Sequence, residues 1–379
     1  MSFLFMACQA GAEAPLKAEI ARRYRDFRFA FSRPGFVTFK VPDDLRNDRQ
    51  FELKSVFART SGFSIDRISG PDVQARVGNA WGLLSKRYPP ESLAQFQNIH
   101  VWERDRRLPG DDGFEPGISP VAREAGEQFI GADPSPGLET QRVLNGLAAT
   151  GKRVLDIVLV EPDQWWLGWH RAHSGSSTWP GGVPDISLPE GTVSRTYLKM
   201  VESLDWSEFP VQRGDACVEI GSAPGGSCQA LLERGLSVTG VDPAEMDAAL
   251  LANPYFTHLR ARAKDLKRRM FSDFRWLMAD ASVAPNYTLD TVEAIVTDRR
   301  VKLEGLLLTL KMTGWDQAGN IPEYTRRVRS WGYRYVRARQ LAYNRREICI
   351  AASDLQPEST DNQPESTDNQ PESTDNHST

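Results

Sequence analysis

Four charged residues in the C-terminal half of the chain have the types needed for proton transfer: Lys199, Asp280, Lys311 and Glu347. Taken singly, each has an ordinary explanation, because lysines on helices are usually solvated and an aspartate after a strand often caps the next helix. Asp280 and Lys311, however, follow two predicted strands, at the sheet edge where α/β folds bind ligands. A buried cluster of two lysines and two carboxylates is costly, which favours a functional site over a stabilising one.

The chemistry that suits this set is removal of a proton from a weakly acidic hydroxyl group. A hydroxyl that attacks a sulfonium methyl group needs a base close enough to take its proton as the new bond forms. A lysine can serve as such a base where burial and a second cation favour the uncharged amine, which makes Lys311 the candidate base and Lys199 the second cation. Asp280 and Glu347 would hold both amino groups. No metal is required, because the sulfonium supplies its own leaving group.

A glycine-rich turn between a predicted strand and helix indicates where a cofactor would bind. The apolar run 216–220 leads into the turn GSAPGG at 221–226, and a helical pattern follows over 227–234. A second apolar run, 237–241, ends at Asp242, whose carboxylate could accept hydrogen bonds from ribose hydroxyls. The turn matches neither the dinucleotide pattern nor a phosphate loop, which favours S-adenosylmethionine, a cofactor with a ribose and no phosphates. A βαβ unit without a ligand is the competing interpretation.

Length and composition bound the protein class. At 379 residues the chain is too long for one ordinary core, which predicts two or three domains. Its four cysteines are widely spaced, as expected of reduced, buried side chains in a cytoplasmic protein. No apolar run is long enough for a transmembrane helix, and His170 and His173 lack the further ligands of a zinc site.

The net charge of -4 is unevenly distributed. Seven acidic and no basic residues lie from Asp354 onward, so the rest of the chain is mildly basic, at about +3. This permits a nucleic-acid partner without arguing for one. Residues 356–376 are three copies of QPESTDN, an acidic tract that cannot bury a core and is predicted to be disordered.

Two α+β units are predicted before the glycine-rich turn. The first has strands at 3–8, 27–33, 36–41 and 63–68 and helices at 14–24 and 51–60. The second has strands at 98–103 and 154–160 and helices at 77–87, 121–129 and 140–148. Trp165, Trp166 and Trp169 end this unit, and a buried wall is favoured over a base-stacking platform.

A doubly wound domain is predicted for the remainder. A segment rich in Gly, Ser and Pro, 173–192, precedes a helix at 193–204. Strands and helices then alternate, with strands at 215–220, 237–241, 256–261, 276–279 and 305–310. This alternation predicts a mainly parallel sheet, with a closing hairpin, 334–341 and 348–352, as its antiparallel edge.

Five segments resemble signature sequences of RlmM-type ribosomal RNA 2′-O-ribose methyltransferases. They are SRTYLK at 194–199, EIGSAPGGS at 219–227, MAD at 278–280, LTLK at 308–311 and NRREICI at 344–350. The Lys-Asp-Lys-Glu tetrad is shared with the wider FtsJ-like 2′-O-methyltransferases. MACQAGAEAPLKAEIARRY at 6–24 is also similar to the family's opening strand and helix.

The resemblance implies an α/β architecture with a Rossmann-like methyltransferase domain and two N-terminal α+β domains. The implied boundaries are a ferredoxin-like unit at 1–70, a THUMP-like RNA-binding domain at 71–175, a linker at 176–193, the methyltransferase domain at 194–353 and a disordered acidic tail at 354–379. The implied function is S-adenosylmethionine-dependent 2′-O-ribose methylation of a cytidine in large-subunit (23S) ribosomal RNA. Naked RNA or a precursor ribosomal particle would be the partner, in the cytoplasm, with no membrane and no metal.

The resemblance also assigns site residues. Lys311 would be the catalytic base, and Lys199, Asp280 and Glu347 would complete the tetrad. The implied contacts of S-adenosylmethionine are Thr196, Ala223, Pro224, Gly225, Gly226, Asp242 and Asp280. The family has an acidic residue after the third strand, whereas this chain reads RARAKD at 260–265, so Asp265 could contact the adenine only after a shift of a few residues.

Two basic stretches, 260–275 and 326–346, are candidate RNA contacts, because arginines and aromatic residues suit phosphate contact and base stacking. Solvated surfaces are the alternative for any single arginine. Two other functions are weighed against RNA methylation. A small-molecule O-methyltransferase would leave two extra domains without a purpose, and a non-catalytic RNA-binding assembly factor would leave the tetrad without one.

Overall fold

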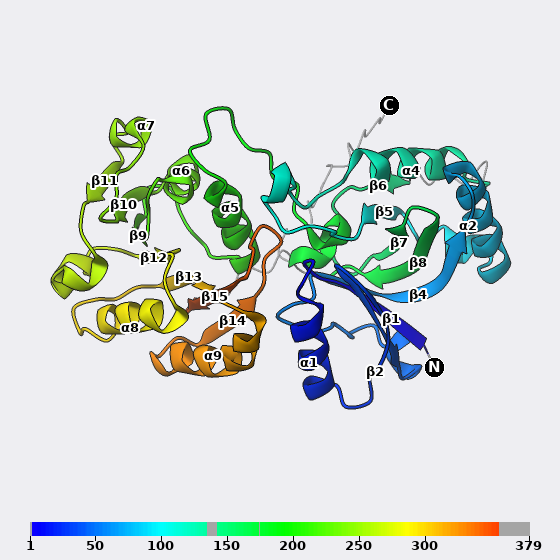
Figure 1. Cartoon of the computed structure of the whole chain (residues 1–379), viewed down its shortest axis with the longest axis horizontal. Coiled ribbons are helices and arrows are strands. Elements are labelled where there is room, and N and C mark those ends of the chain that lie inside the picture. The colour runs from blue at the N-terminus through cyan, green and yellow to red at the C-terminus, as the bar shows by residue number, and fades with distance from the viewer. Residues whose placement is uncertain (1, 135–141, 174, 356–379) are drawn as a thin grey trace, which may run out of the picture.

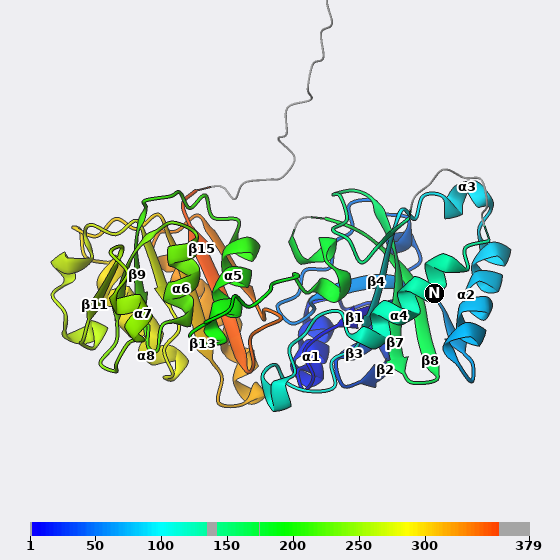
Figure 2. The same ribbon diagram turned by 90° about the horizontal axis from the view of Figure 1, so that it is seen from above.

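The structure is a computed structural model that describes residues 2–134, 142–173 and 175–355. It contains two β-sheets, each covered by helices, which lie side by side along the longest axis of the molecule (Figures 1 and 2). From residue 356 onward, the tail predicted to be disordered lies outside the described residues. Within those residues, no helix is both long enough and apolar enough to cross a lipid bilayer.

All strands that the structure describes before residue 172 belong to one eight-stranded sheet. Its order is β2 (Arg28–Arg33), β3 (Phe36–Val41), β1 (Ser2–Ala7), β4 (Thr60–Ser69), β8 (Gln164–Arg171), β7 (Arg153–Glu161), β5 (Asn98–Glu103) and β6 (Val143–Leu144). The helices of this domain are α1 (Glu13–Arg23), α2 (Val73–Arg87), α3 (Pro90–Leu93) and α4 (Pro120–Gly131). Because β4 pairs with both β1 and β8, the two predicted N-terminal units share a continuous sheet. Their division at residue 70 stays a prediction.

The second sheet has seven strands and confirms the predicted doubly wound α/β domain. Its order is β11 (Phe256–Leu259), β10 (Ser237–Val241), β9 (Ala216–Ile220), β12 (Trp276–Ala279), β13 (Gly305–Lys311), β15 (Glu347–Ser353) and β14 (Tyr335–Arg339). The first five strands are parallel, and β15 runs antiparallel to both of its neighbours. The closing hairpin therefore forms the antiparallel edge, as predicted.

Helices cover both faces of this second sheet, which explains why its central strands are apolar throughout. They are α5 (Thr196–Ser207), α6 (Gly226–Glu233), α7 (Ala248–Leu251), α8 (Pro285–Val296) and α9 (Ile321–Ser330). Alternate residues of β12 enter two different cores: Trp276 packs in the cluster that contains α5 and α6, and Leu277 packs in the one that contains α8 and α9. The sheet therefore fixes the positions of its strand ends, where the charged residues lie.

The predicted helix at 51–60 is wrong. Residues 51–59 have no regular secondary structure, and Thr60 already belongs to β4. The buried carboxylate of Glu19 on α1 accepts hydrogen bonds from the Val56 backbone N–H at 2.9 Å and from the Ser55 hydroxyl at 2.6 Å. These donors are satisfied by another element, so the apolar spacing of this segment does not require a helix.

The predicted helix at 140–148 is also wrong where the structure describes it, from residue 142 onward. Val143 and Leu144 form the short edge strand β6 beside β5, and Asn145 then turns the chain with a φ of 51°. The Asn145 side chain accepts a hydrogen bond from the Val101 backbone at 2.7 Å. Pairing with the sheet edge replaces the helix. In contrast, the three tryptophans of β8 are buried, which confirms the predicted wall.

Candidate active site

The four predicted catalytic residues meet at one edge of the second sheet. Lys311 ends β13 and Glu347 begins β15, and the two residues are partners in the strand register. Asp280 directly follows β12, the parallel neighbour of β13. Lys199 reaches the same place from the first turn of α5. The sheet thus brings together residues separated by up to 148 positions in the sequence.

Each carboxylate of this tetrad faces both amino groups. Lys199 Nζ lies 2.6 Å from Glu347 Oε2 and 3.5 Å from Asp280 Oδ2. Lys311 Nζ lies 3.5 Å from Asp280 Oδ1 and 3.8 Å from Glu347 Oε1. The exposed fraction of the side chain is 28% for Lys311 and 8% for Lys199. Lys311 is therefore the amine that a substrate arriving from solvent can reach.

A serine that the sequence does not distinguish makes the shortest polar contact of Lys311. Lys311 Nζ donates a hydrogen bond to Ser282 Oγ at 2.9 Å. Ser282 is exposed and lies two residues after Asp280, in the loop between β12 and α8. A serine in a loop is too common to be noticed, and only the position of β13 beside β12 reveals the contact.

A cavity of about 280 Å³ adjoins the tetrad at the ends of β9, β10 and β12. Its lining combines acidic side chains with apolar and aromatic ones. It includes Asp242, Asp280, Ile220, Val241, Val283, Val292 and Tyr287. Asp242 is held by the backbone N–H of Ala244 at 2.8 Å and of Ala223 at 3.3 Å. Such a lining suits a ligand with an apolar ring and hydroxyl groups.

Two glycines of the predicted turn let it pack tightly against the segments that carry the tetrad. Gly221 has a φ of 82°, and a Cβ there would lie 2.7 Å from the Ala281 Cα. A Cβ on Gly226 would lie 2.3 Å from Ser194 Oγ. A side chain at either position would displace backbone next to Asp280 or the segment before α5. The turn therefore helps to position the site as well as to border it.

The predicted cofactor contacts divide into two groups. Ala223, Asp242 and Asp280 line the cavity. The others lie at the starts of α5 and α6: Thr196, Pro224, Gly225 and Gly226. Among the residues that the structure describes, these four are not part of the cavity lining. Asp265 is also outside the lining, and residues 261–264 form that wall together with Tyr287. These assignments stay predictions.

Glu219, on β9, is a buried acid close to this cavity. Burial raises the pKa of Glu219 to about 8, and the nearby carboxylates of Asp280 and Asp242 add to the shift. The Cys228 thiol donates a hydrogen bond to Glu219 Oε2 at 2.8 Å. At neutral pH Glu219 is therefore mostly protonated, so the cavity gains no further negative charge beneath Asp242 and Asp280.

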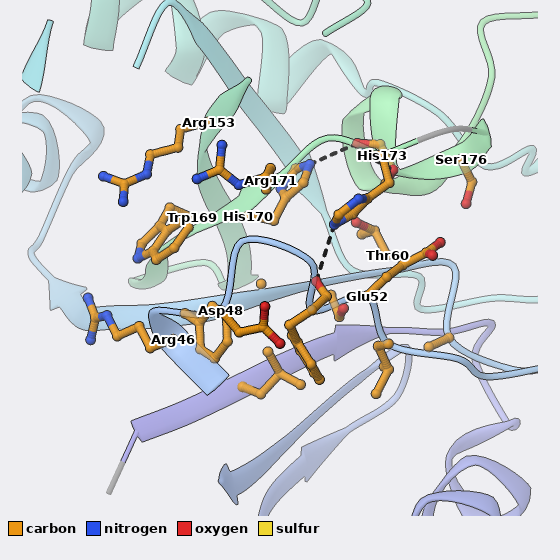
Figure 3. A pocket seen from close by; sticks show the side chains of 18 of the residues that line it. Arg46, Asp48, Glu52, Thr60, Arg153, Trp169, His170, Arg171, His173 and Ser176 are labelled. Atoms are coloured by element: carbon orange, nitrogen blue, oxygen red, sulfur yellow. Dashed lines mark hydrogen bonds between the residues drawn. The ribbon is translucent and has the colours of Figure 1, made fainter. Parts of the chain in front are cut away.

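A second cavity, of about 250 Å³, lies on the N-terminal sheet (Figure 3). Arg49, Arg153 and Arg171 line it, and the Arg153 guanidinium lies 4.8 Å from the centre of the Trp169 ring. Burial lowers the pKa of Arg171, and the charges of Arg153 and Arg49 lower it further. Among described residues these three arginines form no ion pair, whereas Arg33 pairs with Glu161 at 2.9 Å. We call the three residues the arginine cluster.

The two basic stretches differ in availability. In 326–346, Arg327 pairs with Asp290 at 2.6 Å and Arg337 donates to the Ser207 carbonyl at 2.7 Å. Tyr333 and Tyr343 of that stretch are buried. These contacts commit part of it to internal packing, while Arg326, Arg329, Arg334, Arg345 and Arg346 are exposed, so its contact with RNA stays a prediction. In 260–275 four cations are exposed: Arg262, Lys264, Lys267 and Arg269, of which Arg262 and Lys264 line the cavity.

Comparison with known proteins identifies the second domain. Residues 192–312 match the family model described as FtsJ-like methyltransferase, a range that includes three tetrad residues and ends before Glu347. Ribosomal RNA large subunit methyltransferase M of Halorhodospira halophila is 31% identical over 180 residues, or 46% of this chain and 51% of that protein. The match therefore spans about half the length of that relative.

Two more distant relatives match over nearly the full length. Proteins of the same name from Tolumonas auensis and Xanthomonas oryzae pv. oryzae are 22% and 25% identical to this chain. Each match covers 93% of this chain, with 96% and 99% of the relative. Residues 192–312 are thus similar to FtsJ-like methyltransferases, and the chain is similar over most of its length to proteins named ribosomal RNA large subunit methyltransferase M.

Proposed function

We propose that this protein methylates the 2′-hydroxyl of a cytidine ribose in 23S ribosomal RNA, with S-adenosylmethionine as the methyl donor. The observation that supports this most strongly is the tetrad beside a cavity of mixed acidic and apolar lining. The names of the relatives support the substrate class. A cytoplasmic location follows from such a substrate.

Residues of the cavity would hold the cofactor. Asp242 would accept hydrogen bonds from its ribose hydroxyls, and Val283 and Tyr287 would border its adenine. Asp280 Oδ1 is buried and accepts no hydrogen bond from the described residues. A polar group of a ligand in the cavity can therefore donate the missing hydrogen bond. When bound, S-adenosylmethionine supplies an electrophilic methyl group on a sulfonium.

The tetrad would handle the proton of the attacking hydroxyl. Lys311 Nζ, in its uncharged form, would accept this proton as the hydroxyl oxygen bonds to the methyl carbon. Asp280 and Glu347 would hold the amine in line and stabilise the ammonium that forms. Lys199 offsets one of the two carboxylate charges, so the tetrad becomes neutral overall when Lys311 takes up the proton.

Ser282→Ala is expected to lower kcat about twofold to tenfold, the effect of losing one exposed hydrogen bond of 0.5–1.5 kcal/mol. Ser282 Oγ accepts a hydrogen bond from Lys311 Nζ at 2.9 Å and so helps to fix where the amine points. Ser282→Thr, which keeps the hydroxyl, is the control. An unchanged rate in Ser282→Ala would show that the contact has no role.

The arginine cluster is the proposed phosphate contact of the N-terminal domain. Replacing Arg49, Arg153 and Arg171 by alanine should weaken RNA binding and reduce the salt slope of log Kd by about 0.7 for each single-strand phosphate that is no longer neutralised. The rate at saturating RNA should stay the same. Arg33→Ala is the matched control, because Arg33 is already paired with Glu161. Equal salt slopes for the wild type, the triple alanine variant and Arg33→Ala would show that RNA does not bind at the arginine cluster.

The function itself is tested by transfer of label from methyl-labelled S-adenosylmethionine to ribosomal RNA that lacks the modification. Labelled RNA is the expected result, with naked RNA and precursor particles compared as substrates. If neither accepts label although the protein binds S-adenosylmethionine, a small-molecule methyltransferase is favoured. Failure to bind the cofactor would favour a non-catalytic assembly factor.

A further inference from the structure

The loop between β14 and β15, residues 340–346, connects the active site to the N-terminal domain. Glu347 of the tetrad follows this loop directly, and Lys311 at the end of β13 is its partner in the strand register. The Met312 N–H donates to the Arg346 carbonyl at 2.8 Å, which joins the segment after Lys311 to the same loop. The position of the loop therefore determines where two of the four tetrad side chains lie.

A buried pair of glutamines fastens this loop to the N-terminal domain. Gln340 Nε2 donates to Gln9 Oε1 and to the Arg345 carbonyl, both at 2.9 Å, and Gln9 Nε2 donates to the Asn344 carbonyl. Gln9 and Gln340 are each 1% exposed. Because the groups are shielded from water, loss of either side chain leaves polar atoms of the loop without partners.

The contacts continue from this pair to the tetrad. The Arg345 backbone N–H donates to Glu347 Oε2 at 3.3 Å, and the same oxygen lies 2.6 Å from Lys199 Nζ. The Arg345 side chain pairs with Asp111 of the N-terminal domain. Arg345 is thus held at its guanidinium by that domain and at its backbone by Glu347 and Gln340.

Helix α5 holds the opposite side of the loop. Glu202, one turn after Lys199, accepts hydrogen bonds from the backbone N–H groups of Ala342 at 2.8 Å and Tyr343 at 2.9 Å. The loop is therefore enclosed between α5, which carries Lys199, and the N-terminal domain.

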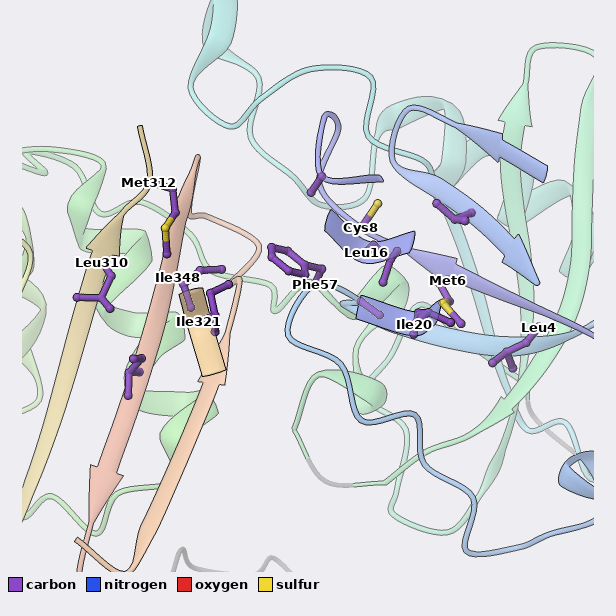
Figure 4. Packing of buried hydrophobic residues seen from close by; sticks show 14 of the residues in the cluster. Leu4, Met6, Cys8, Leu16, Ile20, Phe57, Leu310, Met312, Ile321 and Ile348 are labelled. Atoms are coloured by element: carbon purple, nitrogen blue, oxygen red, sulfur yellow. The ribbon is translucent and has the colours of Figure 1, made fainter. Parts of the chain in front are cut away.

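Apolar packing supports the same junction (Figure 4). Phe57 of the N-terminal domain projects toward β15 and α9, and its ring meets that of Trp315 edge to face at 5.5 Å. Phe57 is 3% exposed and belongs to the same core cluster as Met312 and Ile348, the neighbours in sequence of Lys311 and Glu347. The two domains thus share a core immediately behind the tetrad.

We propose that the N-terminal domain positions the catalytic tetrad, with Gln9 as the key positioning residue, in addition to any contact it makes with RNA. This inference rests on the proposed function for its catalytic consequence. A domain that only captured RNA would affect KM for RNA. A domain that sets the position of Glu347 and Lys311 affects kcat at saturating RNA.

Gln9→Met tests this, because methionine keeps the approximate volume and removes both hydrogen bonds. The variant should lose about tenfold or more in kcat, as expected when buried polar groups lose their partners, with KM for RNA and Kd for S-adenosylmethionine unchanged. The arginine-cluster variant should show the opposite division between kcat and KM. Gln74→Met, at an exposed position of α2, is the control. A normal kcat, or a change in KM alone, would overturn the proposal.

Hydrogen exchange separates failure of this inference from failure of the proposed function. Amides of residues 340–347 should exchange faster in Gln9→Met than in the wild type, whether or not the protein methylates RNA. Unchanged exchange there would overturn the positioning role by itself. If Gln9→Met does not fold, Asp111→Ala, in an exposed loop, is the second variant. It should raise hydrogen exchange at the same residues, because Asp111 pairs with Arg345.

Discussion

Lys311→Ala should slow methyl transfer by about 100-fold to 10,000-fold, the range that a positioned general base contributes. Of the two tetrad lysines, Lys311 has the more exposed side chain, at 28% against 8% for Lys199. It also faces both carboxylates. Because the cavity lining includes Asp242 and Asp280 but not Lys311, binding of S-adenosylmethionine should persist. Single-turnover kinetics with saturating RNA and calorimetric titration of the cofactor measure the two effects.

Lys302→Ala is the matched control for this variant, since Lys302 is an exposed lysine shortly before β13. It should retain wild-type activity. Activity of Lys311→Ala close to that of Lys302→Ala would contradict the assignment of the base. A loss of cofactor binding equal to the loss of rate would instead assign Lys311 to the cofactor site.

Lys199→Met should lower the free energy of unfolding by about 3–5 kcal/mol, the cost of removing one partner from a buried ion pair. Lys199 lies 2.6 Å from Glu347 and 3.5 Å from Asp280, and all three side chains are less than a tenth exposed. Without this ammonium, two buried carboxylates face each other with only the more exposed Lys311 between them. Denaturant unfolding, followed by fluorescence, measures the change.

A double variant distinguishes charge from packing in this result. Lys199→Met combined with Glu347→Gln removes one charge of each sign, so it should recover part of the stability lost in the single variant. If the single variant is as stable as Lys302→Met, the tetrad is not the buried cluster that the distances describe. If the single and double variants are equally unstable, the loss of stability comes from packing and not from the unpaired charge.

The sequence pattern was sufficient to predict the second sheet, because its strands are apolar runs and polar residues follow at their ends. Asp280 and Lys311 could be paired in advance, since the ends of parallel strands meet at one edge. Lys199 and Glu347 were added to them by residue type, as a second cation and a second carboxylate, and the resemblance to a family assigned the same four residues. No local feature of β15 or α5 marks either residue as part of a site.

The failures share one physical cause, namely contacts between distant segments. Residues 51–60 have apolar spacing, yet Glu19 binds their backbone and Phe57 packs on Trp315. Arg327 and Arg337 of the stretch 326–346 looked available but are bound to an acid and to a carbonyl group elsewhere in the fold. Ser282 and Gln9 have ordinary residue types, and only their partners give them importance.

The central claim is the site of methylation, and nucleoside analysis tests it most directly. Large-subunit ribosomal RNA that lacks the modification is incubated with the protein and labelled S-adenosylmethionine, digested to nucleosides and separated. The proposed function predicts label in 2′-O-methylcytidine, and its disappearance with Lys311→Ala. Label in a methylated base, or equal label with the variant, would contradict the account.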